Sequence, residues 1–180
     1  MGMRFLNFTN HVQSKHTFNF VDDFKIILEQ LSFATTTQEL TQITSTFFKQ
    51  AFNIPPRKVS LHLRHSLAKD NLRSNEIDSL VEEFCSTHNQ NVCQFINQNK
   101  IIIYDELMFS NFYEEDRTRT SIIQFLQKIN ADVFLPIFEK ERSIAYIIIE
   151  YNARPTQLYS NVERDEMLVF ASYLSCLLYT

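Results

Sequence analysis

Three cysteines carry the side chains best suited to nucleophilic or redox chemistry. Cys85 and Cys93 stand eight residues apart around a predicted helix and its exit, and Cys176 lies in the last predicted helix. Nothing electropositive flanks Cys85 or Cys93 to favour the reactive thiolate form. Because the number of cysteines is odd and no CxxC occurs, we expect reduced, partly buried thiols rather than a disulfide framework.

The five histidines do not have the spacing of a metal site. His62 and His65 are three residues apart on a predicted strand, which directs their side chains to opposite faces. The other three histidines lie in separate segments: His11, His16 and His88. The chain contains no HExxH and no Cys/His ligand pattern, so we expect neither a metal nor a cofactor.

Acidic and basic residues gather in the middle of the chain, where they could bind a ligand. Asp105 closes a predicted strand, and an acidic run at 114–116 precedes Arg117 and Arg119. Loops that follow strands are where binding residues collect in α/β folds. The alternative is a solvated surface whose salt bridges contribute at most about 1 kcal/mol each.

Composition excludes several classes of function. The single glycine is Gly2, so the chain lacks the glycine-rich loops of Rossmann and P-loop sites and the nucleophile elbow of hydrolases. Tight turns must instead use Asn, Asp, Pro or Ser. A net charge of −4 argues against nucleic acid as a partner. No apolar run approaches the roughly 20 residues that span a bilayer, so we expect a cytoplasmic chain without membrane insertion.

Hydrophobic periodicity predicts helices and strands along most of the chain. The 3.6-residue period favours helices at residues 18–33, 36–53, 74–87, 118–129 and 160–179. Alternating or continuous apolar residues favour strands at residues 58–64, 101–104, 132–138 and 144–151. Residues 92–96 fit either a short helix or an extended piece.

Local features refine this outline. Pro136 indicates a sheet edge or a bulge, and the strongly apolar residues at 144–151 indicate the centre of the sheet. Ser160 and Glu163 fit a capping box at the start of the last helix. Because no linker or repeat divides the chain, we predict one domain at 18–180, preceded by a flexible or helical tail at 1–17.

The last third of the chain has the most specific pattern. One strand ends in Leu135-Pro136-Ile137, four charged residues follow, and a second apolar strand covers 143–149. Tyr159-Ser160 then precedes the closing amphipathic helix, and 101–105 supplies an earlier strand with a trailing acid. This order resembles that of a GAF domain, and the resemblance covers about residues 18–179.

The resemblance implies an α/β (α+β) fold, with an antiparallel sheet of four to six strands, helices on both faces, and N- and C-terminal helices packed together. It implies a regulatory, non-enzymatic module of a signal-transduction protein, such as a sensor histidine kinase of a two-component system. A small-molecule ligand would lie between the sheet and residues 105–125. The polar residues of that pocket would be Asp105, Tyr113, Arg117 and Arg119. If the domain serves only to dimerise, the aromatic residues of this region would fill the pocket.

The family commonly transmits signals through flanking helices that pair in a dimer. We therefore expect a homodimer through the helices at 18–33 and 160–179, leading to an output domain that is not in this chain. The expected interface residues lie on the apolar stripes of these helices: Phe24, Leu28, Leu31, Phe170, Leu174 and Leu178. Two alternatives remain open, a small GAF-type enzyme such as a cysteine-dependent reductase and a ligand-free protein-interaction domain.

Overall fold

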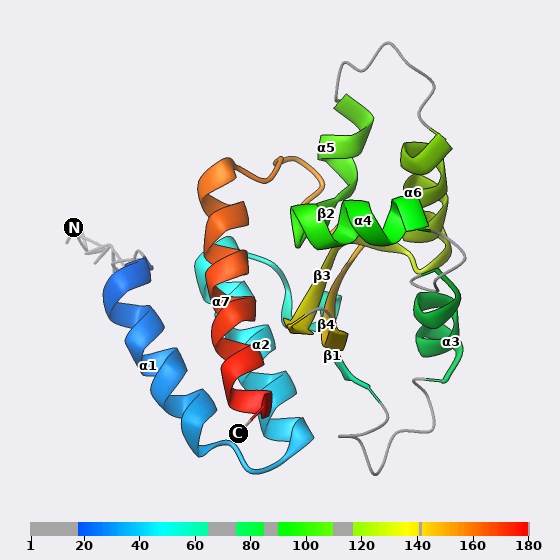
Figure 1. Ribbon diagram of the computed structural model, residues 1–180. Helices are drawn as coiled ribbons and strands as arrows, with labels where there is room; N and C mark the ends of the chain where they lie inside the picture. The colour runs from blue at the N-terminus through cyan, green and yellow to red at the C-terminus, as the bar shows by residue number, and fades with distance from the viewer. Residues whose placement is uncertain (1–17, 65–74, 85–89, 110–116, 141, 180) are drawn as a thin grey trace, which may run out of the picture.

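The computed structural model of the chain describes residues 18–64, 75–84, 90–109, 117–140 and 142–179. These residues form a four-stranded antiparallel sheet with helices on both faces (Figure 1). The predicted α/β (α+β) architecture, with a sheet of four to six strands, is confirmed. The tail expected at 1–17 lies outside the described residues.

Two long strands, β3 (Ala131–Glu139) and β4 (Arg142–Glu150), form the middle of the sheet, whose strand order is β1-β4-β3-β2. The strand β1 (Val59–Leu63) follows a short 3-10 turn and pairs with β4, whereas the two-residue strand β2 (Ile102–Ile103) pairs with β3. The segment predicted to be central is therefore inside the sheet, as β4.

Pro136 occupies a locally exposed edge of β3. It lies opposite Tyr146 of β4, but β2 on the other side pairs only with Val133 and Phe134. Because Pro136 has no N–H to donate, it fits a position where β3 has a partner on one side. The register also shifts between Ile137 and the next residue, which fits the predicted bulge, although β3 itself is an inner strand of the sheet.

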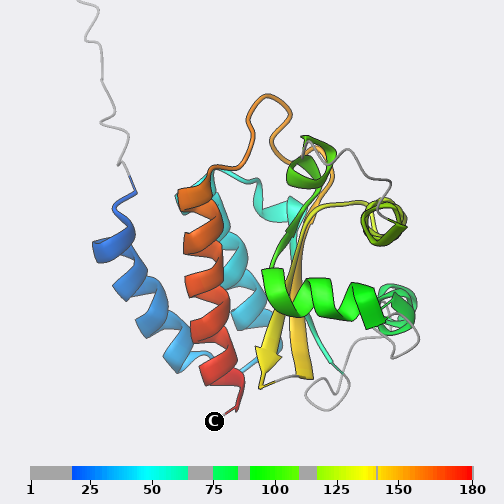
Figure 2. The ribbon, with the colours of Figure 1, turned by 45° about the horizontal axis from the view of Figure 1, so that its top comes forward.

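Three helices cover one face of the sheet: α1 (Phe20–Phe33), α2 (Thr37–Phe52) and α7 (Asn161–Tyr179). Figure 2 shows that α1 is the outermost of the three, so that α2 and α7 lie between it and the strands. Four shorter helices cover the opposite face: α3 (Asn75–Phe84), α4 (Gln90–Asn99), α5 (Tyr104–Phe109) and α6 (Arg117–Lys128). Among the described helices, none is long and apolar enough to cross a bilayer.

Aromatic packing joins the terminal helices. Phe47 of α2 stacks on Phe170 of α7 with ring centroids 4.4 Å apart. Phe24 of α1 contacts both rings, at 5.6 Å from Phe47 and 6.4 Å from Phe170. Burial of such large apolar side chains is a main source of stability. The predicted packing of the N- and C-terminal helices against each other is confirmed.

The same packing corrects the predicted dimer interface. Four of its six residues are buried inside the chain: Phe24, Leu31, Phe170 and Leu174. Their apolar stripes face the core of the same molecule, so these side chains cannot contact a second copy. Leu28 and Leu178 are only partly buried. Homodimerisation itself stays a prediction, and it would have to use residues of the two helices that are not buried within the chain.

Turns are built without glycine, as the composition requires. Among the described residues, five adopt a left-handed backbone with φ between 53° and 60°: Asn53, Lys100, Asn130, Lys140 and Asn152. Asparagine tolerates this region better than most residues. The two lysines were not expected there: Lys100 follows α4, and Lys140 lies in the turn between the inner strands β3 and β4.

The segment around residue 104 differs from the prediction. The strand β2 contains only two residues, although Ile101, Ile102 and Ile103 are all buried as expected. The chain then enters α5, whose first turn contains Asp105 and Glu106. Carboxylates are favourable at a helix N-terminus because they complement its positive dipole end. The choice left open at 92–96 is also settled, since these residues belong to α4.

Candidate functional site

The predicted ligand residues lie near the helices α5 and α6. Asp105 is half-buried in α5, Arg117 is exposed at the start of α6, and Tyr113 lies outside the described residues. Nη2 of Arg119 donates a hydrogen bond of 3.3 Å to the carbonyl oxygen of Met108. Arg119 therefore connects α6 to α5, which is a structural contact that needs no ligand.

Asp105 instead belongs to a polar group at one end of the sheet. Burial raises the pKa of the Asp132 carboxyl, and the negative charge of Asp105 contributes to this rise, whereas the backbone N–H of Ala153 opposes it. Burial also raises the pKa of the Tyr159 hydroxyl well above its usual range, with the charge of Asp132 adding to the effect.

Arg154 neutralises much of this end of the sheet. Its side chain is 5% exposed and forms an ion pair of 2.6 Å with Glu163, and its guanidinium lies 4.9 Å from the centre of the Tyr159 ring. Glu163 also accepts the backbone N–H of Ser160, which confirms the predicted capping box. Arg154 and Glu163 are paired with each other, so we interpret this group as the closure of the 151–160 loop onto α7.

A second polar cluster lies under α3, and it is the strongest candidate for a functional site. The hydroxyl of Tyr146 donates a hydrogen bond to Oδ1 of Asp78. The His62 ring stacks on the Tyr146 ring, with centroids 4.8 Å apart and planes 8° apart. Nε2 of His62 and Oγ of Ser60 lie 3.0 Å apart. Four side chains from β1, β4 and α3 therefore form one connected group, which we call the α3 cluster.

Strand alternation places these residues on one face. In β1 the buried residues Val59, Leu61 and Leu63 face α2 and the other terminal helices, so Ser60 and His62 face the α3 side. His62 is directly opposite Tyr146 in the antiparallel register. Such cross-strand neighbours are close enough for their rings to interact.

Burial controls the protonation of the cluster. It raises the pKa of the Tyr146 hydroxyl far above its usual range, and the hydrogen bond to Asp78 adds to this effect. Burial lowers the pKa of the His62 imidazole, although the charge of Asp78 opposes the change. At neutral pH the tyrosine is therefore protonated and the histidine neutral.

Asp78 retains one unused acceptor. The residue is 8% exposed, and its Oδ2 has no hydrogen-bond partner among the residues that the structure describes. A buried acceptor without a partner costs about 1–3 kcal/mol, and more if it is charged. This atom is the clearest point at which a further group could stabilise the fold.

Aromatic side chains continue the α3 cluster across the sheet. Phe84 of α3 stacks on Phe125 of α6 at 3.7 Å, Phe125 contacts Phe134 at 5.2 Å, and Phe134 contacts Tyr146 at 5.6 Å. A depression of about 190 Å³ lies between α3 and α6 above the first pair of rings. The space expected for a ligand between sheet and helices is thus largely filled by aromatic rings in this region.

The helix α3 covers the cluster with a few apolar side chains. Its buried residues are Asp78, Val81 and Phe84, and the partly buried Ile77 and Leu80 pack against the same core. Isolated helices of this length are marginal in water, so α3 depends on these contacts. Exposure of the cluster requires α3 to move.

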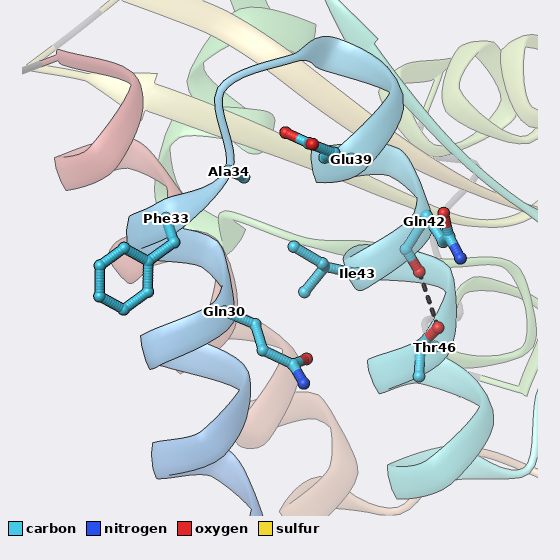
Figure 3. Close-up of a pocket in the computed structure, with 7 residues that line it drawn as sticks. All are labelled: Gln30, Phe33, Ala34, Glu39, Gln42, Ile43 and Thr46. Carbon is cyan, nitrogen blue, oxygen red and sulfur yellow. Dashed lines mark hydrogen bonds between the residues drawn. The ribbon is translucent and has the colours of Figure 1, made fainter.

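A groove of about 540 Å³ separates α1 from α2 on the other side of the molecule. Figure 3 shows Gln30 and Ile43 directed into it, whereas the ring of Phe33 points away. The charged residue of its lining, Glu39, is engaged by the backbone N–H groups of Thr35 and Thr36 in a capping box. The groove thus offers no uncommitted charged group to a ligand.

The other reactive residues do not form a site in the described part of the chain. Cys93 is half-buried on α4 and Cys176 is exposed on α7, while Cys85 lies outside the described residues. Within the described ranges, no three side chains of His, Cys, Asp or Glu are grouped as metal ligands.

The α3 cluster was not predicted from the sequence, where His62 was considered only as a metal ligand. One signal was present, since Tyr146 is the one polar-tipped side chain within the apolar run 144–149. A buried tyrosine usually needs a partner for its hydroxyl.

Comparison of the chain with models of protein families, with curated proteins and with solved structures finds no match. The resemblance to GAF domains therefore stays a prediction.

Proposed function

We propose that this chain is a regulatory domain of a signal-transduction protein. In this proposal it forms a homodimer through the outward surface of α1 and α7, and it binds a small ligand on the opposite side of the sheet. The GAF resemblance suggests this arrangement, and the distribution of exposed apolar side chains supports it.

Exposed apolar residues concentrate on the terminal helices. Ten large apolar side chains are exposed among the described residues, and six of them belong to α1 or α7: Val21, Ile26, Phe33, Val162, Val169 and Tyr173. Scattered exposed apolar residues are ordinary, but a group on two adjacent helices is typical of an interaction surface. This concentration is the observation that carries the proposal.

Helical geometry brings part of this group together. Val169 and Tyr173 are four residues apart and lie on one flank of α7. The ring of Tyr173 contacts Phe24 of α1 at 5.6 Å, so this flank borders α1. On α1, Val21 and Leu28 are seven residues apart, on the flank away from the groove with α2. We call Val21, Leu28, Val169 and Tyr173 the outer seam.

A second copy of the chain is the occupant that the seam fits best. A two-fold symmetric dimer uses the same patch on both subunits, so one apolar seam is sufficient for both sides of the contact. Each large apolar side chain that becomes fully buried contributes roughly 1.5–3 kcal/mol. Signals would pass between copies through α1 and α7, which also contact the core beneath the sheet.

A ligand-free interaction domain is the second candidate. The stacked rings of Phe84 and Phe125 fill the space in which a ligand was expected, and this observation favours a domain that only binds proteins. The two candidates share the outer seam and differ in whether the α3 side of the sheet binds a small molecule.

Light scattering coupled to size-exclusion chromatography tests the proposal. We expect the wild-type chain to be a dimer and the variant Val169→Glu/Tyr173→Glu to be a folded monomer, because charges at the seam oppose its burial. The matched control Met108→Glu/Phe109→Glu introduces the same two charges at exposed apolar residues of α5 and should remain a dimer. A monomeric wild-type chain, or a dimer that persists in the seam variant, contradicts the proposal.

A further inference from the structure

Among the described residues, Asp78 is the buried carboxylate that has one oxygen without a hydrogen-bond partner. Oδ1 receives the Tyr146 hydroxyl, whereas Oδ2 has no hydrogen-bond partner among the described residues. Most buried polar atoms in native structures have a partner, so an exception of this kind calls for a cause. The ion pairs at the sheet end and the capped Glu39 in the α1–α2 groove show no comparable free carboxylate.

We propose that the α3 cluster binds a small molecule carrying a positively charged, planar nitrogen group, such as an amidinium, whose N–H donates to Oδ2 of Asp78. This inference rests on the proposed ligand-binding function and names the chemical class of the ligand. The residues of the proposed site lie in β1, β4 and α3.

The local charge favours a cation. Asp78 and Glu82 both act on the Tyr146 hydroxyl as negative charges, and Arg64 acts on it as a positive charge. His62 is neutral at neutral pH because burial lowers its pKa. One negative charge therefore remains in excess, and a monovalent cation balances it. A buried carboxylate forms its strongest hydrogen bonds with charged donors.

The neighbouring rings favour a planar group. His62 and Tyr146 stack nearly parallel, and the Tyr146 hydroxyl donates to Asp78 from the edge of this stack. Flat cations such as guanidinium and amidinium groups can stack on aromatic rings and donate two N–H bonds in one plane. A tetrahedral ammonium group makes less contact with the flat face of an aromatic ring.

Entry of the ligand requires a small opening of α3. Oδ2 is covered in the chain without ligand, since less than 1 Å² of its surface is accessible. Such an opening separates α3 from the core into which Val81 and Phe84 are buried and against which Ile77 and Leu80 pack. A ligand that binds only the opened form shifts the population of α3 toward that form. Ligand binding would therefore change the conformation of this face of the molecule.

Benzamidine is a suitable probe, because it combines an amidinium with an aromatic ring, and benzoate is its anionic counterpart. Binding is followed by NMR of the imidazole signals in histidine-labelled protein, with the His62 signal assigned by its loss in His62→Gln. We expect benzamidine to shift the His62 signal in a saturable manner and benzoate to leave it unchanged.

Three variants separate the site from general effects. Asp78→Asn keeps an acceptor for Tyr146 but removes the charge, and it should weaken binding by at least about tenfold, as expected for loss of a hydrogen bond to a charged group. Glu83→Gln removes an exposed carboxylate of the same helix and should bind as the wild type does. Tyr146→Phe leaves both Asp78 oxygens unused and should bind benzamidine at least as tightly, which keeps the test valid if Asp78→Asn does not fold.

The inference is overturned if benzamidine does not shift the His62 signal. It is also overturned if Asp78→Asn binds benzamidine as tightly as the wild type, or if Glu83→Gln binds it more weakly. Light scattering on the same samples keeps the two proposals apart. A dimer that does not bind benzamidine contradicts the proposed ligand class but not the proposed dimer. A monomer that binds benzamidine through Asp78 contradicts the proposed dimer but not the proposed ligand site.

Discussion

Replacing Tyr146 by phenylalanine removes one oxygen atom and leaves the packing of the ring unchanged. The hydroxyl donates to Asp78 in an environment where Tyr146 is fully buried. A hydrogen bond to a charged group contributes about 1.5–3 kcal/mol, and its loss leaves a buried carboxylate without any donor among the described residues. We therefore expect Tyr146→Phe to lower the free energy of unfolding by this amount.

Urea denaturation followed by circular dichroism measures this change. For a slope of about 2 kcal/mol per molar urea, the expected loss lowers the midpoint by about 0.8–1.5 M. The control Tyr173→Phe removes a hydroxyl from an exposed ring and should change stability by less than about 0.5 kcal/mol.

The double variant Tyr146→Phe/Asp78→Leu makes the test stricter. When both polar partners are replaced by apolar groups of similar shape, the penalty of an unpaired buried group disappears. The double variant should therefore be more stable than Tyr146→Phe alone. A neutral Tyr146→Phe, or a double variant less stable than this single one, refutes the account of the α3 cluster.

Three further outcomes follow from the structure. Leu174→Ala should destabilise the chain by about 2–5 kcal/mol in urea denaturation, because Leu174 is fully buried in the core rather than at an interface; a change below about 1 kcal/mol contradicts this placement. The pKa of His62 is lowered in the folded chain, so the unfolded chain binds the proton first and stability is lost as the pH falls through about 6.5. Melting temperatures between pH 7.5 and 5 should fall more steeply for the wild type than for His62→Gln, and equal slopes argue against a buried neutral His62. Thr36→Ala removes the capping box of α2 and should cost about 0.5–2 kcal/mol by thermal denaturation, whereas an unchanged melting temperature shows that the cap is dispensable.

Local sequence signals were sufficient for most elements of the fold. Alternation predicted β1, the continuous apolar run predicted β4 inside the sheet, and Ser160 marked the start of α7 through its capping box. Each of these signals depends on residues close in the sequence. They hold because the tertiary structure agrees with the local preference in these segments.

Elements that depend on distant contacts were predicted less well. The apolar residues at 101–104 indicated a longer strand, but β2 pairs with β3 only at Phe134 and Val133, and Tyr104 already belongs to the next helix. The helix α5 begins immediately afterwards and uses Asp105 in its first turn. Short strands and helices of this kind are decided by their neighbours rather than by their own composition.

Apolar stripes did not distinguish a core from an interface. Leu174 lies on the predicted stripe of α7, but α1 and α2 cover that stripe within the same chain. The residues left outside, such as Val169 and Tyr173, lie on the flank of the stripe. A helical period shows that one face of the helix is buried. It does not show whether that face packs against the same molecule or against another one.

The candidate site was the part least visible in the sequence. Alternation favoured a strand at 58–64, and His62 was considered only as a possible metal ligand. In the structure α3 covers the face on which His62 lies and brings Asp78 to Tyr146, a contact between residues 68 positions apart. Such a buried polar pair leaves no periodic signal, because each partner is isolated in its own segment.

Native mass spectrometry of the purified chain tests the central claim most directly, since it reports the number of subunits and any bound small molecule together. The account predicts a dimer that carries additional mass, a monomer for Val169→Glu/Tyr173→Glu, and loss of the additional mass in a dimeric Asp78→Asn. A wild-type monomer without added mass would contradict both the seam between copies and the ligand site beneath α3.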